Sequence, residues 1–224
     1  IDGQGGSDWL SLENYAVNID LNSGSNGIHN IENIVDRQTG SSRTIWGSTG
    51  TNTFIMHDGN DRVYGRAGDD VYDLGSGNDR ADANYGSDTL IGGSGTDILD
   101  YENYGSSSGT KIFLQDANID TNNDEVGDLS VTRTITSLNI EGLNTLADGA
   151  HDFYEVTDSR GFTDYIYKEN DDTADFETFD LSGSNDTMVG DEAANRILAN
   201  NGNDIILGMG GNDTIYGGNG TDLL

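Results

Sequence analysis

The 224-residue sequence contains no cysteine and no proline. The absence of cysteine excludes disulfides and thiolate metal sites. The absence of proline suits long β-ladders, because each proline would remove a backbone hydrogen-bond donor. No apolar run is long enough to span a membrane, and the first residues, Ile-Asp-Gly-Gln-Gly-Gly, resemble neither an initiator methionine nor a signal peptide. We therefore expect the chain to be a fragment of a longer protein.

Basic and hydrophobic residues are also scarce. Forty acidic residues against ten lysines and arginines give a formal net charge of -30, and only 33% of the residues are hydrophobic. Such a chain borders on disorder unless a counter-ion offsets its self-repulsion. The acidity argues against nucleic acid, whose phosphates require a basic surface, and against an anionic membrane surface. We expect neither nucleic-acid binding nor membrane insertion.

Glycine is abundant, with 32 residues, and much of it belongs to a nine-residue repeat. Each repeat is a glycine-rich turn, an aspartate two positions after a glycine, and a short strand with one inward apolar residue, which is the pattern of a solenoid. The inward positions run from Val63 to Leu99 in a first block and from Met188 to Leu224 in a second. The first block has Asp61, Asp70, Asp79, Asp88 and Asp97, with Gly59, Gly68, Gly77, Gly86 and Gly95. The second has Asp186, Asn195, Asp204, Asp213 and Asp222, with Gly202, Gly211 and Gly220.

The period of the repeat predicts a metal. Two nonapeptides close one flattened coil, so aspartates eighteen residues apart stack on the same edge at about 4.8 Å. Like charges at this spacing repel, and a cation between them removes the conflict. Carboxylate and turn carbonyl oxygens are ligands of a hard cation, which indicates Ca2+. Asn52 and Asn195 replace aspartate in this register and bring no charge, so we expect a weak site or none there.

The repeat resembles the RTX (repeats-in-toxin) nonapeptide Gly-Gly-x-Gly-x-Asp-x-hydrophobic-x of the calcium-binding parallel β-roll. Residues 92–99 and 217–224 match its first eight positions. The resemblance implies an all-β parallel β-roll, with the aspartates and the carbonyls near the turn glycines as calcium ligands. It also implies type I secretion as an unfolded chain and folding in external calcium. The implied aspartate pairs are Asp61 with Asp79, Asp70 with Asp88, Asp79 with Asp97, Asp186 with Asp204, and Asp204 with Asp222.

Segments of a different pattern, which we call brackets, flank the first block. Period-two alternation at Val17, Ile19 and Leu21 predicts strands in the first bracket, and its Asp-Trp-Leu opening at Asp8 returns as Asp-Ile-Leu at Asp97. We predict four segments. They are a β bracket with a partial nonapeptide at 1–43, β-roll block one at 44–99, a β bracket with insertions at 100–179, and β-roll block two at 180–224.

A second oxygen-rich stretch lies in the second bracket. Asp120, Asn122 and Asp124 resemble the Asp-x-Asn-x-Asp calcium loops of EF-hand and dockerin type. Glu125 replaces the glycine of the sharp turn, and no bidentate glutamate follows at the twelfth position. A calcium loop and a solvated acidic loop are both compatible with this stretch.

The three histidines, His29, His57 and His151, form no close pair in the sequence, so a catalytic zinc site or a histidine-based triad has no support and we expect no enzyme. Our first hypothesis is a calcium-folded structural module of a large secreted or cell-surface protein, such as an adhesin or surface-layer protein. The alternative is the RTX region of an exoenzyme of serralysin or alginate epimerase type, with catalysis elsewhere. A third hypothesis is carbohydrate binding, with Trp9, Tyr15, Tyr101 and Tyr104 as the candidate sugar-stacking aromatics. We also expect self-association through the solenoid ends, because open β-edges can pair with another chain.

Overall fold

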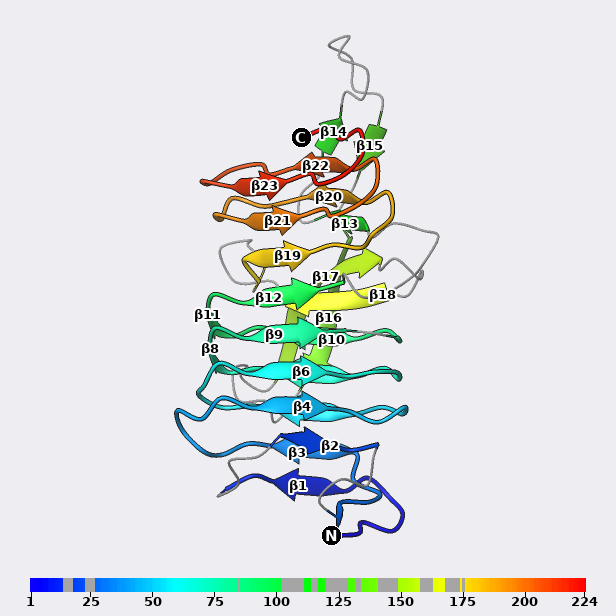
Figure 1. Ribbon diagram of the computed structural model, residues 1–224, viewed down its shortest axis with the longest axis vertical. Helices are drawn as coiled ribbons and strands as arrows, with labels where there is room; N and C mark the ends of the chain where they lie inside the picture. The colour runs from blue at the N-terminus through cyan, green and yellow to red at the C-terminus, as the bar shows by residue number, and fades with distance from the viewer. Residues whose placement is uncertain are drawn as a thin grey trace.

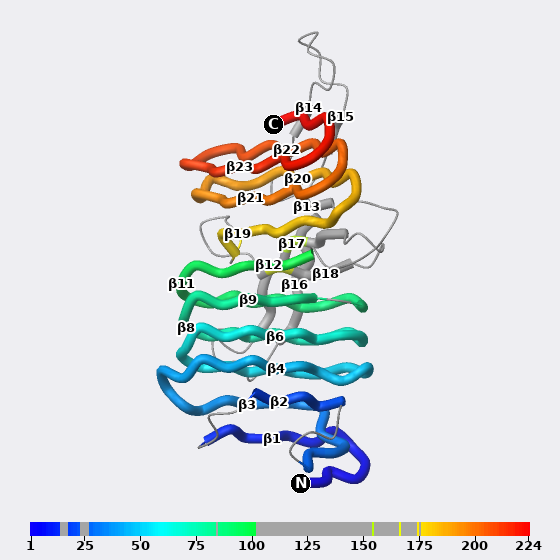
Figure 2. The backbone as a smooth tube through the Cα atoms, in the orientation of Figure 1, coloured from blue at the N-terminus to red at the C-terminus, as the bar shows by residue number. Residues whose placement is uncertain are grey.

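The chain folds into an all-β solenoid. The computed structural model describes residues 1–13, 18–22, 27–83, 85–101, 111–113, 117–119, 129–131, 134–140, 149–157, 163–167, 174 and 176–224. Figure 1 shows coils stacked along the long axis, with the N-terminus at one end and the C-terminus toward the other. The tube in Figure 2 shows each coil running through one sheet and returning through the second. The predicted fold class, an all-β parallel β-roll, is confirmed.

The described residues contain no α-helix, and therefore no helix that could cross a membrane. Two sheets face each other across the solenoid. The first sheet has eleven strands among the described residues. In spatial order they are β1 (Trp9–Ser11), β3 (Asn33–Val35), β5 (Thr53–Ile55), β7 (Val71–Asp73), β10 (Thr89–Ile91), β18 (Thr163–Tyr167), β17 (Gly149–Thr157), β13 (Lys111–Phe113), β20 (Thr187–Val189) and β22 (Ile205–Leu207), with β16 (Thr134–Ile140) attached to β17.

The second sheet has eight strands in the part of the chain that the structure describes. They are β2 (Ile19–Asp20), β4 (Thr44–Trp46), β6 (Arg62–Tyr64), β9 (Arg80–Asp82), β12 (Ile98–Asp100), β19 (Thr178–Asp180), β21 (Arg196–Leu198) and β23 (Thr214–Tyr216). Two further pairs form small sheets. They are β8 (Ser76–Gly77) with β11 (Ser94–Gly95), and β14 (Ala117–Ile119) with β15 (Leu129–Val131).

Within each block, a strand pairs in parallel with the strand eighteen residues later. In the second sheet Val63, Ala81 and Leu99 stand in register. The first sheet likewise aligns Phe54 with Tyr72. Because the pairing period equals the sequence period, equivalent residues of successive coils lie directly above one another.

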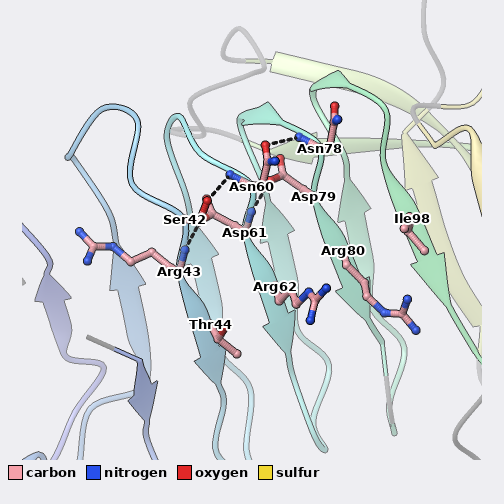
Figure 3. Close-up of a pocket in the computed structure, with 10 residues that line it drawn as sticks. All are labelled: Ser42, Arg43, Thr44, Asn60, Asp61, Arg62, Asn78, Asp79, Arg80 and Ile98. Carbon is pink, nitrogen blue, oxygen red and sulfur yellow. Dashed lines mark hydrogen bonds between the residues drawn. The ribbon is translucent and has the colours of Figure 1, made fainter. Parts of the chain in front are cut away.

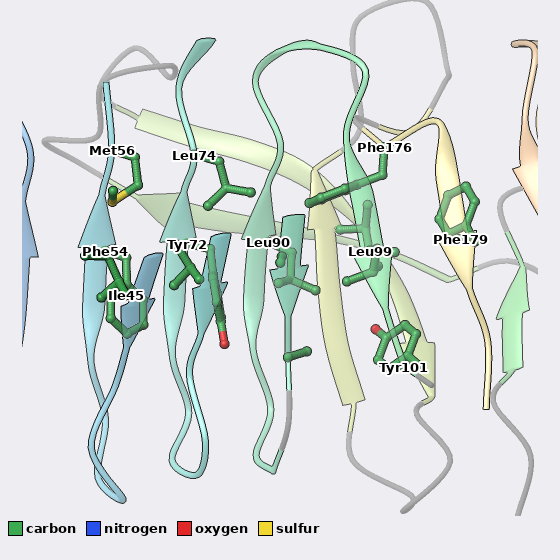
Figure 4. Packing of buried hydrophobic residues seen from close by; sticks show 14 of the residues in the cluster. Ile45, Phe54, Met56, Tyr72, Leu74, Leu90, Leu99, Tyr101, Phe176 and Phe179 are labelled. Carbon is green, nitrogen blue, oxygen red and sulfur yellow. The ribbon is translucent and has the colours of Figure 1, made fainter. Parts of the chain in front are cut away.

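The core is a thin layer between the sheets, supplied mainly by the middle residue of each strand. Figure 4 shows side chains from both sheets meeting in this layer. The fully buried middle residues include Val63, Ala81, Leu99, Phe179 and Ile197 from the second sheet and Phe54, Tyr72, Leu90 and Met188 from the first. Leu224 was expected to point inward, but it is 60% exposed because its coil has a neighbour on one side only. Each fully buried side chain contributes about 1.5–3 kcal/mol, so such a narrow core limits stability.

The second bracket joins the blocks differently in the two sheets. In the first sheet, β18, β17 and β13 stand between β10 and β20, and β17 is antiparallel to β18, β13 and β16. In the second sheet β12 pairs directly with β19, aligning Leu99 with Phe179. The blocks are therefore continuous in one sheet and separated by bracket strands in the other. The predicted segment boundaries at 43, 99 and 179 stay predictions.

Replacing Leu99 tests the core at this junction. Leu99 is fully buried, so Leu99→Ala removes apolar contacts and leaves a cavity, with an expected loss of about 2–5 kcal/mol in the free energy of unfolding. Urea unfolding in calcium, followed by far-UV circular dichroism, measures this loss. Leu224→Ala is the control, since its side chain is 60% exposed and should change stability little. Equal effects of the two substitutions would contradict the assigned core.

Candidate metal centres

The repeat aspartates lie in turns, directly before strands or, for Asp222, before the bridge residue Leu223. Successive turns alternate between the two edges of the solenoid, so the aspartates form two columns. The first column precedes strands of the first sheet and contains Asp70, Asp88, Asp186, Asp204 and Asp222. The second column precedes strands of the second sheet and contains Asp61, Asp79, Asp97 and Asp213.

In each aspartate pair, one carboxylate oxygen of the later aspartate accepts a backbone N–H from the coil before it. The backbone N–H of Asp61 donates to Asp79 Oδ1 at 2.7 Å, and the N–H of Asp79 donates to Asp97 Oδ1 at 2.8 Å. The equivalent contacts run from Asp70 to Asp88, from Asp186 to Asp204 and from Asp204 to Asp222. The structure thus brings together the five aspartate pairs that the RTX resemblance implies.

The second carboxylate oxygen is left without a donor. Oδ2 of Asp61, Asp70, Asp79, Asp97 and Asp204 is buried and accepts no hydrogen bond from the described residues. An ionised oxygen removed from water without a partner carries a large desolvation cost. A cation bound at these oxygens would remove that cost.

Burial is the largest influence on these carboxyl groups. It raises the pKa of Asp61 to about 6, that of Asp97 to about 7, and those of Asp70 and Asp79 to about 8. The backbone N–H donors act in the opposite direction, and nearby acidic charges, such as Glu177 beside Asp97, raise the pKa further. Without a cation, the fold therefore favours protonated carboxyl groups near neutral pH.

The turns are packed so closely that glycine is required in them. Gly77 and Gly95 have φ angles of +154° and +150°. A Cβ at Gly77 would collide with the backbone oxygen of Gly59, and one at Gly95 with that of Gly77. The carbonyl of one turn thus approaches the next turn at the level of the aspartates. The other predicted turn glycines, all with positive φ, are Gly59, Gly68, Gly86, Gly202, Gly211 and Gly220.

These turns fit a hard cation with mixed oxygen ligands. Within the described part of the chain, no three Asp, Glu, His or Cys side chains form a group that could hold a metal. A cation here must therefore combine an aspartate pair with backbone carbonyl oxygens. Calcium accepts such a set, usually about six to eight oxygens in flexible geometry. The donor-free carboxylate oxygens and the stacked turn carbonyls both fit it.

A polar ladder beside the second column was not anticipated from the sequence. The N–H of Asn78 donates to Asn60 Oδ1 at 3.0 Å, and that of Thr96 donates to Asn78 Oδ1 at 3.1 Å. Figure 3 shows this ladder with Asp61 and Asp79 at the edge of a pocket of about 350 Å³. In the sequence, this ladder corresponds to a short oxygen-bearing side chain one position before each repeat aspartate. These contacts hold successive turns together independently of the aspartates.

Three positions in the columns lack a carboxylate. Asn52 donates its backbone N–H to Asp70 Oδ1 at 2.7 Å, which places it in the first column without adding charge. Arg43 lies eighteen residues before Asp61 and donates its backbone N–H to Asp61 Oδ1 at 2.7 Å, while its side chain forms a buried ion pair with Asp36 at 2.7 Å. The second column therefore has no aspartate pair before Asp61 and Asp79. Asn195 donates its N–H to Asp213 Oδ1 at 2.9 Å, which places it in the column without adding charge.

Two other hypotheses from the sequence concern the acidic loop and the aromatic strip. Asp120, Asn122 and Asp124 lie outside the described residues, so the acidic-loop site stays a prediction. The aromatic strip is wrong in one member, because Tyr101 is fully buried in the core and presents no face to a sugar, whereas Trp9 is 49% exposed. The remaining two aromatics, Tyr15 and Tyr104, lie outside the described residues.

Comparison with known proteins agrees with this geometry. Residues 46–81, 73–103, 180–212 and 189–224 match the family model of the RTX calcium-binding nonapeptide repeat, in four copies. The chain contains RTX calcium-binding repeats in both blocks. Comparison with curated proteins gives no match. The RTX segments contain every aspartate of both columns, so the chain is a structural calcium-binding module in the form of a β-solenoid.

Asp79 is the most informative ligand position to replace, because it pairs with both Asp61 and Asp97. Asp79→Asn removes the charge that calcium requires, so the midpoint calcium concentration for folding should rise at least about tenfold, equivalent to about 1.4 kcal/mol. Isothermal titration calorimetry should also show fewer calcium ions bound per chain. Glu13→Gln is the control for loss of one negative charge, because Glu13 is exposed and lies outside both columns. An unchanged midpoint for Asp79→Asn would remove it from the ligand set.

The raised pKa values set the pH dependence of the metal-free fold. The carboxyl groups of Asp70 and Asp79 bind protons more tightly in the folded chain than in the unfolded chain, where the reference pKa is 3.8. In chelator, stability should therefore increase as the pH falls from about 8 toward 4, because protonation occurs in the folded state first. Circular dichroism in chelator at pH 8 and pH 5 measures the change.

Asp70→Asn should reduce this pH dependence, whereas Glu13→Gln, at an exposed position outside both columns, should not. β-structure that declines between pH 8 and pH 5 in chelator would contradict the prediction.

Proposed function

We propose that this chain is a calcium-dependent structural module of a large secreted or cell-surface protein, of adhesin or surface-layer type. The observation that supports the proposal most directly is the set of buried aspartate oxygens without donors in both blocks. Their charge destabilises the metal-free coil, so calcium binding supplies free energy of folding. The chain would then stay open where calcium is scarce and fold where calcium is plentiful.

Different groups of residues contribute to calcium-dependent folding. When bound, calcium supplies positive charge between stacked carboxylates. The Oδ1 atoms already position each aspartate through the N–H of the preceding coil, as in Asp61 to Asp79. The turn glycines let carbonyl oxygens approach the same edge, and the narrow core fixes the register of the strands. A disordered chain with charge -30 and few apolar residues suits export before folding, as type I secretion of RTX proteins requires.

The shape of the molecule favours a structural role over a catalytic one. The coils form one continuous stack in the second sheet, from β2 to β23, across the junction between the blocks. The arrangement of a bracket followed by a nonapeptide block also occurs twice in the chain. Such tandem units suit an extended protein built by repetition.

A calcium titration tests the proposal. We expect the metal-free chain at pH 7.5 to give a disordered circular dichroism spectrum, and calcium to convert it cooperatively to a β spectrum. Magnesium at the same concentration should not do so, because it demands near-octahedral geometry and gives up its water reluctantly. A chain with full β-structure in chelator at this pH would show that folding does not depend on calcium.

A further inference from the structure

The carboxylate ladder continues through two glutamates that are not part of any nonapeptide. Glu177 Oε2 accepts the backbone N–H of Asp97 at 2.7 Å, which is the contact that Asp97 Oδ1 makes with the N–H of Asp79 at 2.8 Å. At the other end of the chain, Glu32 Oε2 accepts the N–H of Asp8 at 2.9 Å. Glu32 and Glu177 lie outside every segment that matches the RTX repeat.

The strand register shows that the two glutamates occupy equivalent places. In the second sheet β12 and β19 align Ile98 with Thr178, which sets Glu177 beside Asp97 across 80 residues of sequence. In the first sheet β1 and β3 align Trp9 with Asn33, so Glu32 stands beside Asp8 across 24 residues. In each case the interval between the aspartate and the glutamate exceeds the eighteen residues of a regular coil, and the glutamate takes the place that the next aspartate of the column would occupy.

The aspartates of both pairs carry the feature that marks a cation site in the repeats. Asp97 is fully buried, and its Oδ2 accepts no hydrogen bond from the described residues. Oδ2 of Asp8 is likewise buried without a donor among these residues. Asp100 and Asp180, at the other ends of β12 and β19, already have a cationic partner, because Arg80 contacts both of them. The negative charge of Asp97 and Glu177 is therefore concentrated at the turn edge.

We propose that Asp97, the last aspartate of the first block, and Glu177, which lies outside every nonapeptide repeat, form a further calcium site, and that this site joins the two parts of the solenoid. Asp8 and Glu32 form the corresponding site in the first bracket. The inference rests on the proposed calcium-dependent fold and extends it to residues that no repeat contains. Glutamate is one methylene longer than aspartate, which lets it reach the neighbouring coil from a turn that is not a nonapeptide.

The site at the junction has a specific consequence for folding. In the first sheet, bracket strands separate the blocks, so direct block-to-block pairing is confined to β12 and β19 in the second sheet (Figure 1). An ion held by Asp97 of the first block and by Glu177, directly before β19, adds an oxygen crosslink at that contact. With it, the two blocks should fold as one unit, and without it they should respond to calcium separately.

The substitution Glu177→Gln tests this site. Glutamine keeps the size of the side chain and an oxygen that can accept the Asp97 N–H, but it removes the charge. Glu192→Gln is the matched control, because Glu192 is exposed and lies outside both columns. Native mass spectrometry in calcium counts bound ions, and we expect one fewer calcium in Glu177→Gln than in the wild type and in Glu192→Gln.

Tryptophan fluorescence and circular dichroism together measure whether the two parts of the solenoid fold at the same calcium concentration. Both tryptophans, Trp9 and Trp46, precede the junction, so their fluorescence follows the first part of the solenoid, whereas circular dichroism follows the whole chain. The two signals should change at the same calcium concentration in the wild type and in Glu192→Gln, and at different concentrations in Glu177→Gln. An unchanged calcium count with coincident transitions in Glu177→Gln would overturn the inference.

A failure of the inference is distinguishable from a failure of the proposed function. If the wild type does not fold with calcium, the proposed function itself is wrong. If the wild type folds and Glu177→Gln equals it, only the junction site is wrong. Should Glu177→Gln not fold in calcium at all, Glu32→Gln tests the same arrangement away from the junction. One calcium fewer in that variant supports the inference, and a full count overturns it.

Discussion

The repulsion between stacked carboxylates is the constraint on which the rest of this structure depends. A parallel β-solenoid with an eighteen-residue period places identical side chains above one another at about 4.8 Å, so an acidic position becomes a column of negative charge. In this chain the column is also buried, as the full burial of Asp97 shows. While these carboxyl groups are ionised, the column requires positive charge at the same edge, and the turn carbonyls beside the aspartates make calcium the suitable ion.

The remaining features follow from that dependence. Ions that crosslink neighbouring coils reduce the need for a thick core, and a single layer of residues such as Tyr72 and Leu99 then suffices to fix the register. Side-chain ladders, such as that of Asn60 and Asn78, hold successive turns together. Arg43 stands where the second column begins, in the place of a carboxylate, and its charge is neutralised by the buried ion pair with Asp36.

Strict spacing made most of the fold predictable. The nine-residue period located the turns, the strands and inward residues such as Val63 and Ala81, because each repeat occupies the same place in a coil. Spacing gave no information where the chain leaves the solenoid. Glu177 lies 80 residues after Asp97, so its place in the column depends on strand pairing across the bracket. The burial of Tyr101 likewise depends on contacts with the second block, where its N–H donates to the Asp180 carbonyl.

The alternation of turns between two edges restricts how such an array can change in length. A nine-residue insertion would move every later turn to the opposite edge and every later strand to the opposite sheet. If the insertion lay between Asp79 and Asp97, for example, Asp97 would lie on the edge away from Asp79, and β12 would no longer follow β9. Two added repeats, eighteen residues, restore both relations. Duplication within a block therefore preserves the fold only in whole coils, so block lengths should differ by even numbers of repeats.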